Sequence, residues 1–175
     1  NCNPVHMGMQ DIYDIYLPPF QAAIRDANMA TIMNAYPELD GEVVAASKRI
    51  LSDLLREELG FDGLIVSDYE AVLMINNFHY MTESLSEAAK LALEAGIDVE
   101  LPEIVCYGET LKADLEAGDV SLEVLDSAVE RHLNTKYDLG LFDNPYVDEG
   151  IVLEVFETKE QRKLAREIAN ESIVL

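Results

Sequence analysis

The stretch GFDGLIVSDYEAV (Gly60–Val72) combines a turn, a short apolar strand and a polar strand end. The run Leu64–Val66 is apolar and rich in β-branched residues, as expected of a buried strand. It stops at Ser67-Asp68-Tyr69. Aspartate at a strand end is commonly a turn residue or a helix N-cap, so position alone does not make Asp68 a functional residue.

Amphipathic helices are predicted on both sides of this strand. Residues 46–60 carry leucines and isoleucine at helical spacing and end at Gly60, a typical helix C-cap. Downstream, Ser84 and Glu87 have the spacing of a capping box, and Gly96 closes the helix that follows. The central strand is therefore expected to lie between two crossover helices.

The remaining elements continue this alternation. We expect a buried strand over 29–36, a third over 97–101 that stops at Pro102, and the opening of a fourth over 172–175. The predicted helices cover 9–27, which Pro18-Pro19 should split, and 107–117, 121–138 and 158–170, the last begun by a Thr158/Gln161 capping box.

Apolar strands that alternate with amphipathic helices indicate an α/β fold with parallel strands. An eight-fold βα barrel and an open doubly wound sheet both fit this order of elements. A whole barrel needs roughly 250 residues, and only three strands precede the turn-rich segment at 139–150. If the fold is a barrel, we expect this chain to hold its second half only.

Charge and composition exclude several kinds of partner. The chain has 34 acidic and 12 basic residues, a formal charge of −22, so nucleic acids and anionic membranes are poor partners. No run approaches the roughly 18 apolar residues of a membrane span. The cysteines, Cys2 and Cys106, are predicted to be free thiols, and the three histidines form no metal motif. We predict no metal site and no cofactor.

The ends of the chain leave its context open. It begins NCNPVHMGMQ, without an initiator Met, and ends ESIVL, inside an apolar run. We therefore expect both ends to be cut from a longer protein. Cellular compartment and oligomeric state stay open on this evidence.

Polar side chains gather at three predicted strand ends: Asn34-Ala35-Tyr36, then Ser67-Asp68-Tyr69-Glu70, then Asp98 with Glu100. Strand ends on one face of a βα barrel carry its functional residues. Carboxylates accept hydrogen bonds from sugar hydroxyls, and aromatic rings pack against the apolar faces of sugars. The pattern favours a polyhydroxylated ligand. Met33 is predicted to be a core residue near enough to a strand end to line the same pocket.

Six stretches, in this order, resemble the motifs of glycoside hydrolase family 3: YLPPFQAAI (Tyr16–Ile24), IMNAYPELDG (Ile32–Gly41), GFDGLIVSDYEAV (Gly60–Val72), ALEAGIDVELP (Ala92–Pro102), LGLFDNPYVD (Leu139–Asp148) and AREIANESIVL (Ala165–Leu175). The resemblance covers almost the whole chain. It implies the C-terminal part of a barrel domain over residues 1–140, a linker over 141–157, and over 158–175 the first helix and strand of an α/β sandwich domain.

The resemblance implies a retaining, exo-acting β-glycosidase acting on terminal glucosyl or xylosyl residues of an oligosaccharide or an aryl or alkyl β-glycoside. Asp68 matches the family's nucleophile, a role that needs an ionised carboxylate. Tyr36 matches a tyrosine near it that could donate a hydrogen bond, and Tyr69 lines the sugar site. The family's acid/base carboxylate has no counterpart here, so we expect it outside this chain.

Alternatives stay open at this point. The choice between glucoside and xyloside depends on space for one hydroxymethyl group, which upstream residues should set. Tyr69 argues against the branch of the family that cleaves N-acetylglucosaminides, in which Asp or Thr usually follows Ser-Asp. A sugar-binding relative that has lost catalysis would also fit the fold, although an intact Asp68 and Tyr36 favour an enzyme.

Overall fold

The computed structural model describes the backbone of residues 2–174 and their side chains except that of Leu153. The chain divides into two compact units, the first ending at Leu139 and the second beginning at Gly140. Each unit is described by itself. No helix of the described residues is both long and apolar enough to cross a bilayer.

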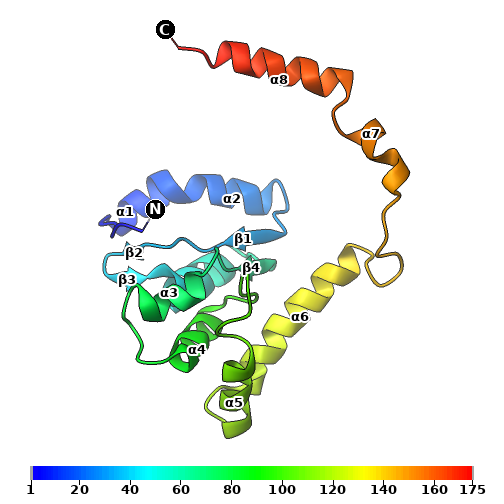
Figure 1. Ribbon diagram of the computed structural model, residues 1–175. Helices are drawn as coiled ribbons and strands as arrows, with labels where there is room; N and C mark the ends of the chain where they lie inside the picture. Colours follow the sequence, from blue (N-terminus) through cyan, green and yellow to red (C-terminus); the bar gives the residue numbers. More distant parts are fainter. Residues whose placement is uncertain (1, 175) are drawn as a thin grey trace. The chain divides into compact units, whose positions relative to one another are not determined.

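Two parallel strands form the centre of the first unit (Figure 1). β1 (Thr31–Met33) pairs with β4 (Leu64–Val66), with Thr31 opposite Leu64 and Met33 opposite Val66. Because the strands are parallel, their carboxyl ends lie at the same edge. The prediction of a strand over 64–66 is confirmed.

The other two strands predicted for the first unit are shorter than expected. β1 spans three residues, and Thr31 and Met33 are exposed rather than buried, because β1 pairs on one side only among the described residues. The segment predicted as a strand over 97–101 makes one parallel bridge, Val66 with Val99. The N–H groups of Asp98 and Val99 both reach the carbonyl of Ile65, so no regular ladder continues.

The predicted break at Pro18-Pro19 is wrong, because helical structure runs without interruption from α1 (Met9–Asp11) through η1 (Ile12–Tyr16) into α2 (Leu17–Arg25). Proline interrupts a helix because it lacks a donor and its ring meets the carbonyl four residues back. Here η1 is a π-helix, and its wider turn comes directly before the two prolines, which occupy the first turn of α2.

A small hairpin follows β1. β2 (Glu38–Leu39) pairs antiparallel with β3 (Glu42–Val43) across Asp40-Gly41. Both turn residues have positive φ, 52° and 84°, the pattern of a type I′ turn that favours Asp-Gly. The 3₁₀ turn η2 (Val44–Ala46) then leads into the π-helix η3 (Arg49–Glu58), which begins and ends close to the predicted bounds.

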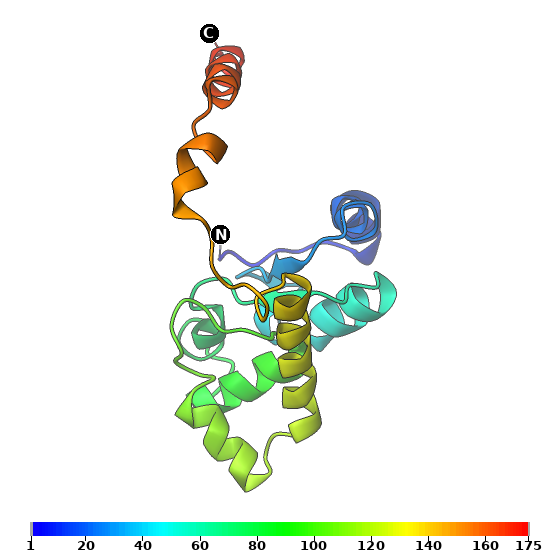
Figure 2. The same cartoon turned by 90° about the vertical axis from the view of Figure 1, so that its right-hand side faces the viewer.

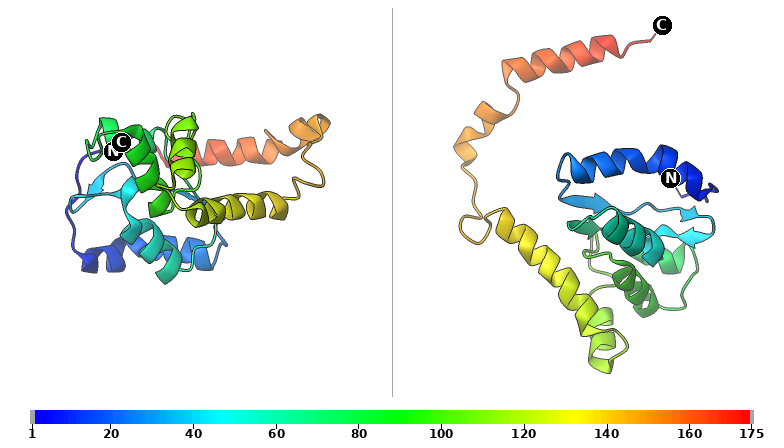
Figure 3. Two further views of the ribbon diagram at one scale, coloured as in Figure 1. Left: turned by 90° about the horizontal axis from the view of Figure 1, so that it is seen from below. Right: turned by 180° about the vertical axis from the view of Figure 1, so that it is seen from behind.

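The remaining helices of this unit are α3 (Ala71–Asn77), α4 (Leu85–Ala95), α5 (Glu109–Ala117) and α6 (Leu122–Asp138). The hydroxyl of Ser84 caps α4 by accepting from the N–H of Glu87, and Gly96 ends it in a left-handed conformation, both as predicted. α4 contacts α3, α5 and α6, and α6 also reaches β4 (Figure 2). From behind, α2 and η3 are seen on either side of β1 (Figure 3).

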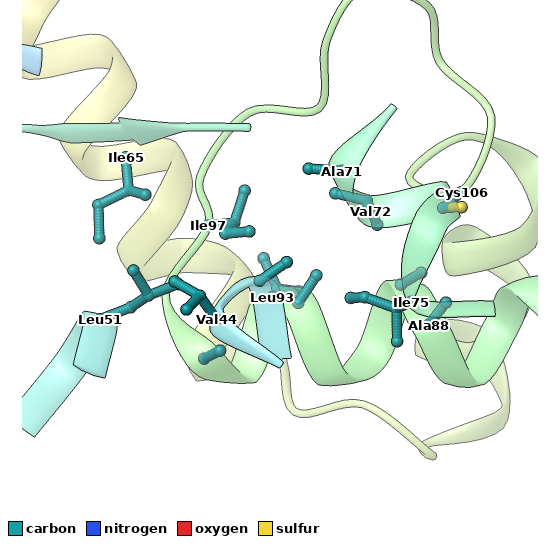
Figure 4. Packing of buried hydrophobic residues seen from close by; sticks show 14 of the residues in the cluster. Val44, Leu51, Ile65, Ala71, Val72, Ile75, Ala88, Leu93, Ile97 and Cys106 are labelled. Atoms are coloured by element: carbon teal, nitrogen blue, oxygen red, sulfur yellow. The ribbon is translucent and has the colours of Figure 1, made fainter. Parts of the chain in front are cut away.

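The core lies where β4 meets α3 and α4 (Figure 4). Ile65, Val72, Ile75 and Ile97 are fully buried there. Complete burial of such a side chain contributes roughly 1.5–3 kcal/mol each. Gly63 precedes β4 because a Cβ there would stand 2.2 Å from the carbonyl oxygen of Ala30, closer than any side chain tolerates. This packing fixes the strand from which Ser67-Asp68-Tyr69 extends.

The second unit consists of η4 (Glu149–Ile151), α7 (Val152–Val155) and α8 (Lys159–Glu171). Thr158 and Gln161 form the predicted capping box of α8. The predicted linker over 141–157 includes η4 and α7, so it is partly helical. No strand forms over 172–174, since none of the described residues supplies a partner strand, and Leu175 lies outside them.

Candidate active site

Asp68 lies at the carboxyl end of β4, half-buried between two loops. Its N–H donates to Oδ1 of Asn34, at 3.2 Å, which ties the end of β4 to the end of β1. Its own Oδ1 accepts from the N–H of Tyr69 at 2.7 Å. Asn34 is buried and also donates from Nδ2 to the carbonyl of Ala35. The backbone of Asp68 is therefore held by the Asn34 amide, and its carboxylate by the N–H of Tyr69, at the edge where the parallel strands end.

Tyr36 spans the same edge from the loop after β1. The sequence predicts a hydrogen bond from its hydroxyl to Asp68. The hydroxyl donates to the carbonyl of Tyr69 at 2.9 Å, and a side-chain hydrogen bond with the Asp68 carboxylate also contributes to its raised pKa. Burial, reinforced by the Asp68 carboxylate, raises the pKa of Tyr36 to about 12. The phenol therefore stays neutral and acts as a donor over the ordinary pH range. Tyr36, Asp68 and Tyr69 form one connected group.

Tyr69 and Met33 are both exposed, but on different surfaces. Tyr69 is 60% exposed, so its ring is free to contact a ligand. Met33 is also half exposed, but it lines an apolar hollow of about 180 Å³ between α2, β1 and η3, a hollow whose lining does not include Asp68. The structure thus brings Tyr36 and Tyr69 to Asp68 and places Met33 on a neighbouring surface.

Asp98 is not a ligand-facing carboxylate at the strand end. Its side chain is fully buried and accepts from Arg56 at 2.7 Å and from Arg131 at 2.7 Å. It also accepts from the N–H of Ile65 at 2.9 Å. Burial lowers the pKa of Arg56, and Asp98 opposes that shift. Asp98 therefore joins η3, β4 and α6, and the sequence-based expectation for this residue is wrong.

Glu100 is also a structural residue. It is 8% exposed, and its carboxylate accepts from the N–H groups of Val105, Cys106 and Tyr107 at 2.8–3.1 Å. Burial and the adjacent Glu100 raise the pKa of the Cys106 thiol to about 12. These contacts shape the loop after Pro102 and leave no free carboxylate for a ligand.

A contact that the sequence did not indicate connects His79 to this region. Nε2 of His79 lies 2.9 Å from the carbonyl of Tyr36, and Nδ1 lies 3.3 Å from Glu38. The two segments are about forty positions apart, so no local pattern signals the contact. Among residues 2–174, no three His, Cys, Asp or Glu side chains come together as metal ligands do.

Residues 1–135 match the family model described as glycosyl hydrolase family 3 N terminal domain. The chain belongs to glycosyl hydrolase family 3. It is 36% identical over 177 residues to a β-xylosidase of Formosa agariphila, covering 97% of this chain and 24% of that protein. It is 35% identical over 178 residues to a periplasmic β-glucosidase of Salmonella typhimurium, covering 99% of this chain and 23% of that protein.

Solved structures of family 3 enzymes have the same fold. A β-glucosidase from Erythrobacter marinus superimposes with a TM-score of 0.91 at 37% identity, covering 98% of this chain and 23% of the other. A β-glucosidase from Listeria innocua in complex with glucose gives 0.86 at 38% identity, covering 94% and 22%. This family 3 chain thus spans about a quarter of the length of the relatives that it matches.

Proposed function

We propose that the intact protein is a retaining, exo-acting β-glycosidase that hydrolyses terminal non-reducing β-D-glucosyl residues, with Asp68 as its nucleophile. The observation that carries the proposal is the connected group at the carboxyl end of β4. There a half-buried carboxylate accepts from the N–H of Tyr69, whose ring is exposed, and acts on the neutral phenol of Tyr36. The α/β fold and the family 3 membership support the same reading.

The chemistry follows the retaining route. An oxygen of the Asp68 carboxylate forms a bond to the anomeric carbon while the bond to the leaving oxygen breaks, and a second carboxyl group gives that oxygen its proton. Water then attacks the glycosyl-enzyme, its proton passes back to the second carboxylate, and Asp68 is released. The second carboxyl group is proposed to come from residues outside this chain.

The other residues of the site are assigned to binding. Tyr36 keeps the loop after β1 against the Asp68 segment and holds its hydroxyl as a donor. Tyr69 offers an exposed ring to the apolar face of a sugar. Met33 is proposed as an apolar contact farther from the nucleophile, at the rim of its own hollow.

β-Xylosidase activity is the second candidate. The relatives of similar identity include both a β-xylosidase and a β-glucosidase, at 36% and 35%. The two sugars differ by one hydroxymethyl group, so the choice depends on space at that position. Oligosaccharides and aryl or alkyl β-glycosides are the substrate classes that fit either activity.

We also propose the domain assignment that the resemblance implies. Residues 1–140 would form the C-terminal half of a (β/α)₈ barrel, 141–157 a linker, and 158–175 the start of an α/β sandwich domain. Parallel strands with helical crossovers in the first unit support the barrel. The capped, amphipathic α8 supports the start of a second domain.

The test is Asp68→Ala in the intact protein, assayed with nitrophenyl β-glucoside and β-xyloside. Loss of the nucleophile should lower kcat/KM by several orders of magnitude, on the order of 10⁴-fold or more, with the fold retained by circular dichroism. Asp62→Ala, an exposed aspartate before β4, is the matched control and should keep wild-type turnover. Near-normal hydrolysis by Asp68→Ala, or a 2-fluoro glycoside that labels another residue, would overturn the assignment.

A further inference from the structure

His79 has a buried side chain that contacts the candidate site through the backbone of Tyr36. It follows α3, and its ring is 3% exposed, packed edge-on against Phe78 at a centroid distance of 5.0 Å. Its Nε2 contacts the carbonyl of Tyr36 at 2.9 Å. The hydroxyl of the same Tyr36 donates to the carbonyl of Tyr69, next to Asp68. A chain of contacts therefore runs from α3 through Tyr36 to the proposed nucleophile.

Both groups that face the ring of His79 are acceptors. A backbone carbonyl only accepts, and so does the ionised carboxylate of Glu38, 3.3 Å from Nδ1. The neutral ring carries one N–H and can serve one of these partners, leaving a lone pair against the other. The doubly protonated ring donates to both. The geometry therefore matches the charged form of His79.

The charged groups around the ring also favour the charged form of His79. His79 lines a hollow of about 390 Å³ whose other ionisable lining residues are the carboxylates Glu38, Asp40 and Glu42. Glu42 pairs with Arg49 at 2.7 Å, and Asp40 lies 3.5 Å from His6. Glu38 has no arginine or lysine among its described contacts, and its ionic partner is His79. α3 itself carries no charged residue.

We propose that His79, in its doubly protonated form, is a positioning residue that holds the Tyr36 loop against Asp68, so that hydrolysis depends on the protonation of this ring. The inference rests on the proposed glycosidase function. His79 touches no substrate in this scheme. It acts through the carbonyl of Tyr36 on one side and is held by Glu38 on the other.

The discriminating measurement is the ratio of kcat/KM between wild type and His79→Gln across pH, in the intact protein with nitrophenyl glucoside. Glutamine donates one hydrogen bond but does not titrate, so titrations common to both proteins cancel in the ratio. We expect a ratio of roughly tenfold at low pH, the size of one charge-assisted hydrogen bond, falling several-fold as pH rises. A ratio that does not change with pH would overturn the proposal.

Three further variants sharpen the test. Glu38→Gln leaves the Tyr36 contact intact but removes the carboxylate that holds Nδ1 of His79, so its kcat/KM should lie between those of wild type and His79→Gln. In a Tyr36→Phe background, His79→Gln should cost much less than it does in wild type, because both changes act through one residue. Independent, additive losses would contradict the mechanism. His132→Gln, on α6, should match wild type throughout.

A readout without activity separates this inference from the proposed function. In His79→Gln, backbone hydrogen exchange over residues 34–39 should quicken about tenfold relative to wild type, while His132→Gln should not change it. If wild type cleaves neither glycoside, the proposed function fails while exchange still tests the His79 contact. Unchanged exchange over 34–39 would overturn the contact even in an active enzyme.

Discussion

Glu70 adopts a left-handed backbone conformation, with φ of 62°, where the Asp68 segment turns into α3. A side chain in that region is strained, and glycine is not. Glu70→Gly should therefore raise the free energy of unfolding of the intact protein by about 0.5–1 kcal/mol, measured by urea denaturation. Glu70→Ala keeps the Cβ and should give no such gain. A loss of stability in Glu70→Gly would show that the side chain, not the backbone, matters here.

Tyr36 gives a pH-dependent prediction. Its pKa is about 12 in the folded protein and about 10 in an unfolded chain. From about pH 10 upward the unfolded state releases a proton that the folded state keeps, so stability falls as pH rises through this window. Below pH 10 both states are protonated and the shift contributes nothing. The stability difference between wild type and Tyr36→Phe should therefore shrink from about pH 10 to 12 by urea denaturation, and a constant difference would contradict this.

Residue type alone did not distinguish structural from ligand-facing carboxylates at the strand ends. Asp68, Asp98 and Glu100 all follow or end apolar runs, and the sequence predicted one ligand-facing role for them. Asp98 is instead paired with Arg131, thirty-three positions away. Glu100 turns back onto its own loop. Local pattern carries no information about such distant partners, and only the resemblance singled out Asp68.

At the scale of elements, Asp98 joins three of them with one buried carboxylate. Asp98→Asn keeps the shape but leaves two arginines without their counter-charge. Breaking a buried pair in this way should cost about 3–5 kcal/mol in thermal or urea unfolding. Asp26→Asn removes an exposed carboxylate that also pairs with an arginine, and should leave stability unchanged within error. Equal effects of the two variants would refute the buried role.

Helices were predicted more accurately than strands, for a physical reason. Helix ends are encoded by nearby residues: Ser84 and Gly96 for α4, and Thr158 with Gln161 for α8. A strand needs a partner elsewhere in the chain. The apolar run after Gly96 therefore looked like a full strand, although only Val99 makes a bridge. The prolines of α2 led to a wrongly predicted helix break, because the π-helix that precedes them was not visible in the sequence.

At the scale of the molecule, the first unit has surfaces suited to contact with further protein. β1 pairs on one side only among the described residues, and an apolar hollow opens beside it. Unpaired strand edges and apolar patches promote association. The 175 residues expressed alone should therefore aggregate on size exclusion and release no nitrophenol from either glycoside. A monomer that unfolds cooperatively and hydrolyses the glycosides would refute the proposed half-barrel.

The burial of Cys106 has a practical consequence. Its thiol is fully buried with a pKa of about 12, so maleimides and other thiolate-directed reagents have no route to it in the folded protein. Cys2 is partly exposed and lies near enough to Tyr36 to influence its ionisation. Of the two thiols in this chain, a fluorescent probe would therefore attach to Cys2, where its emission would report on the loop that holds Tyr36.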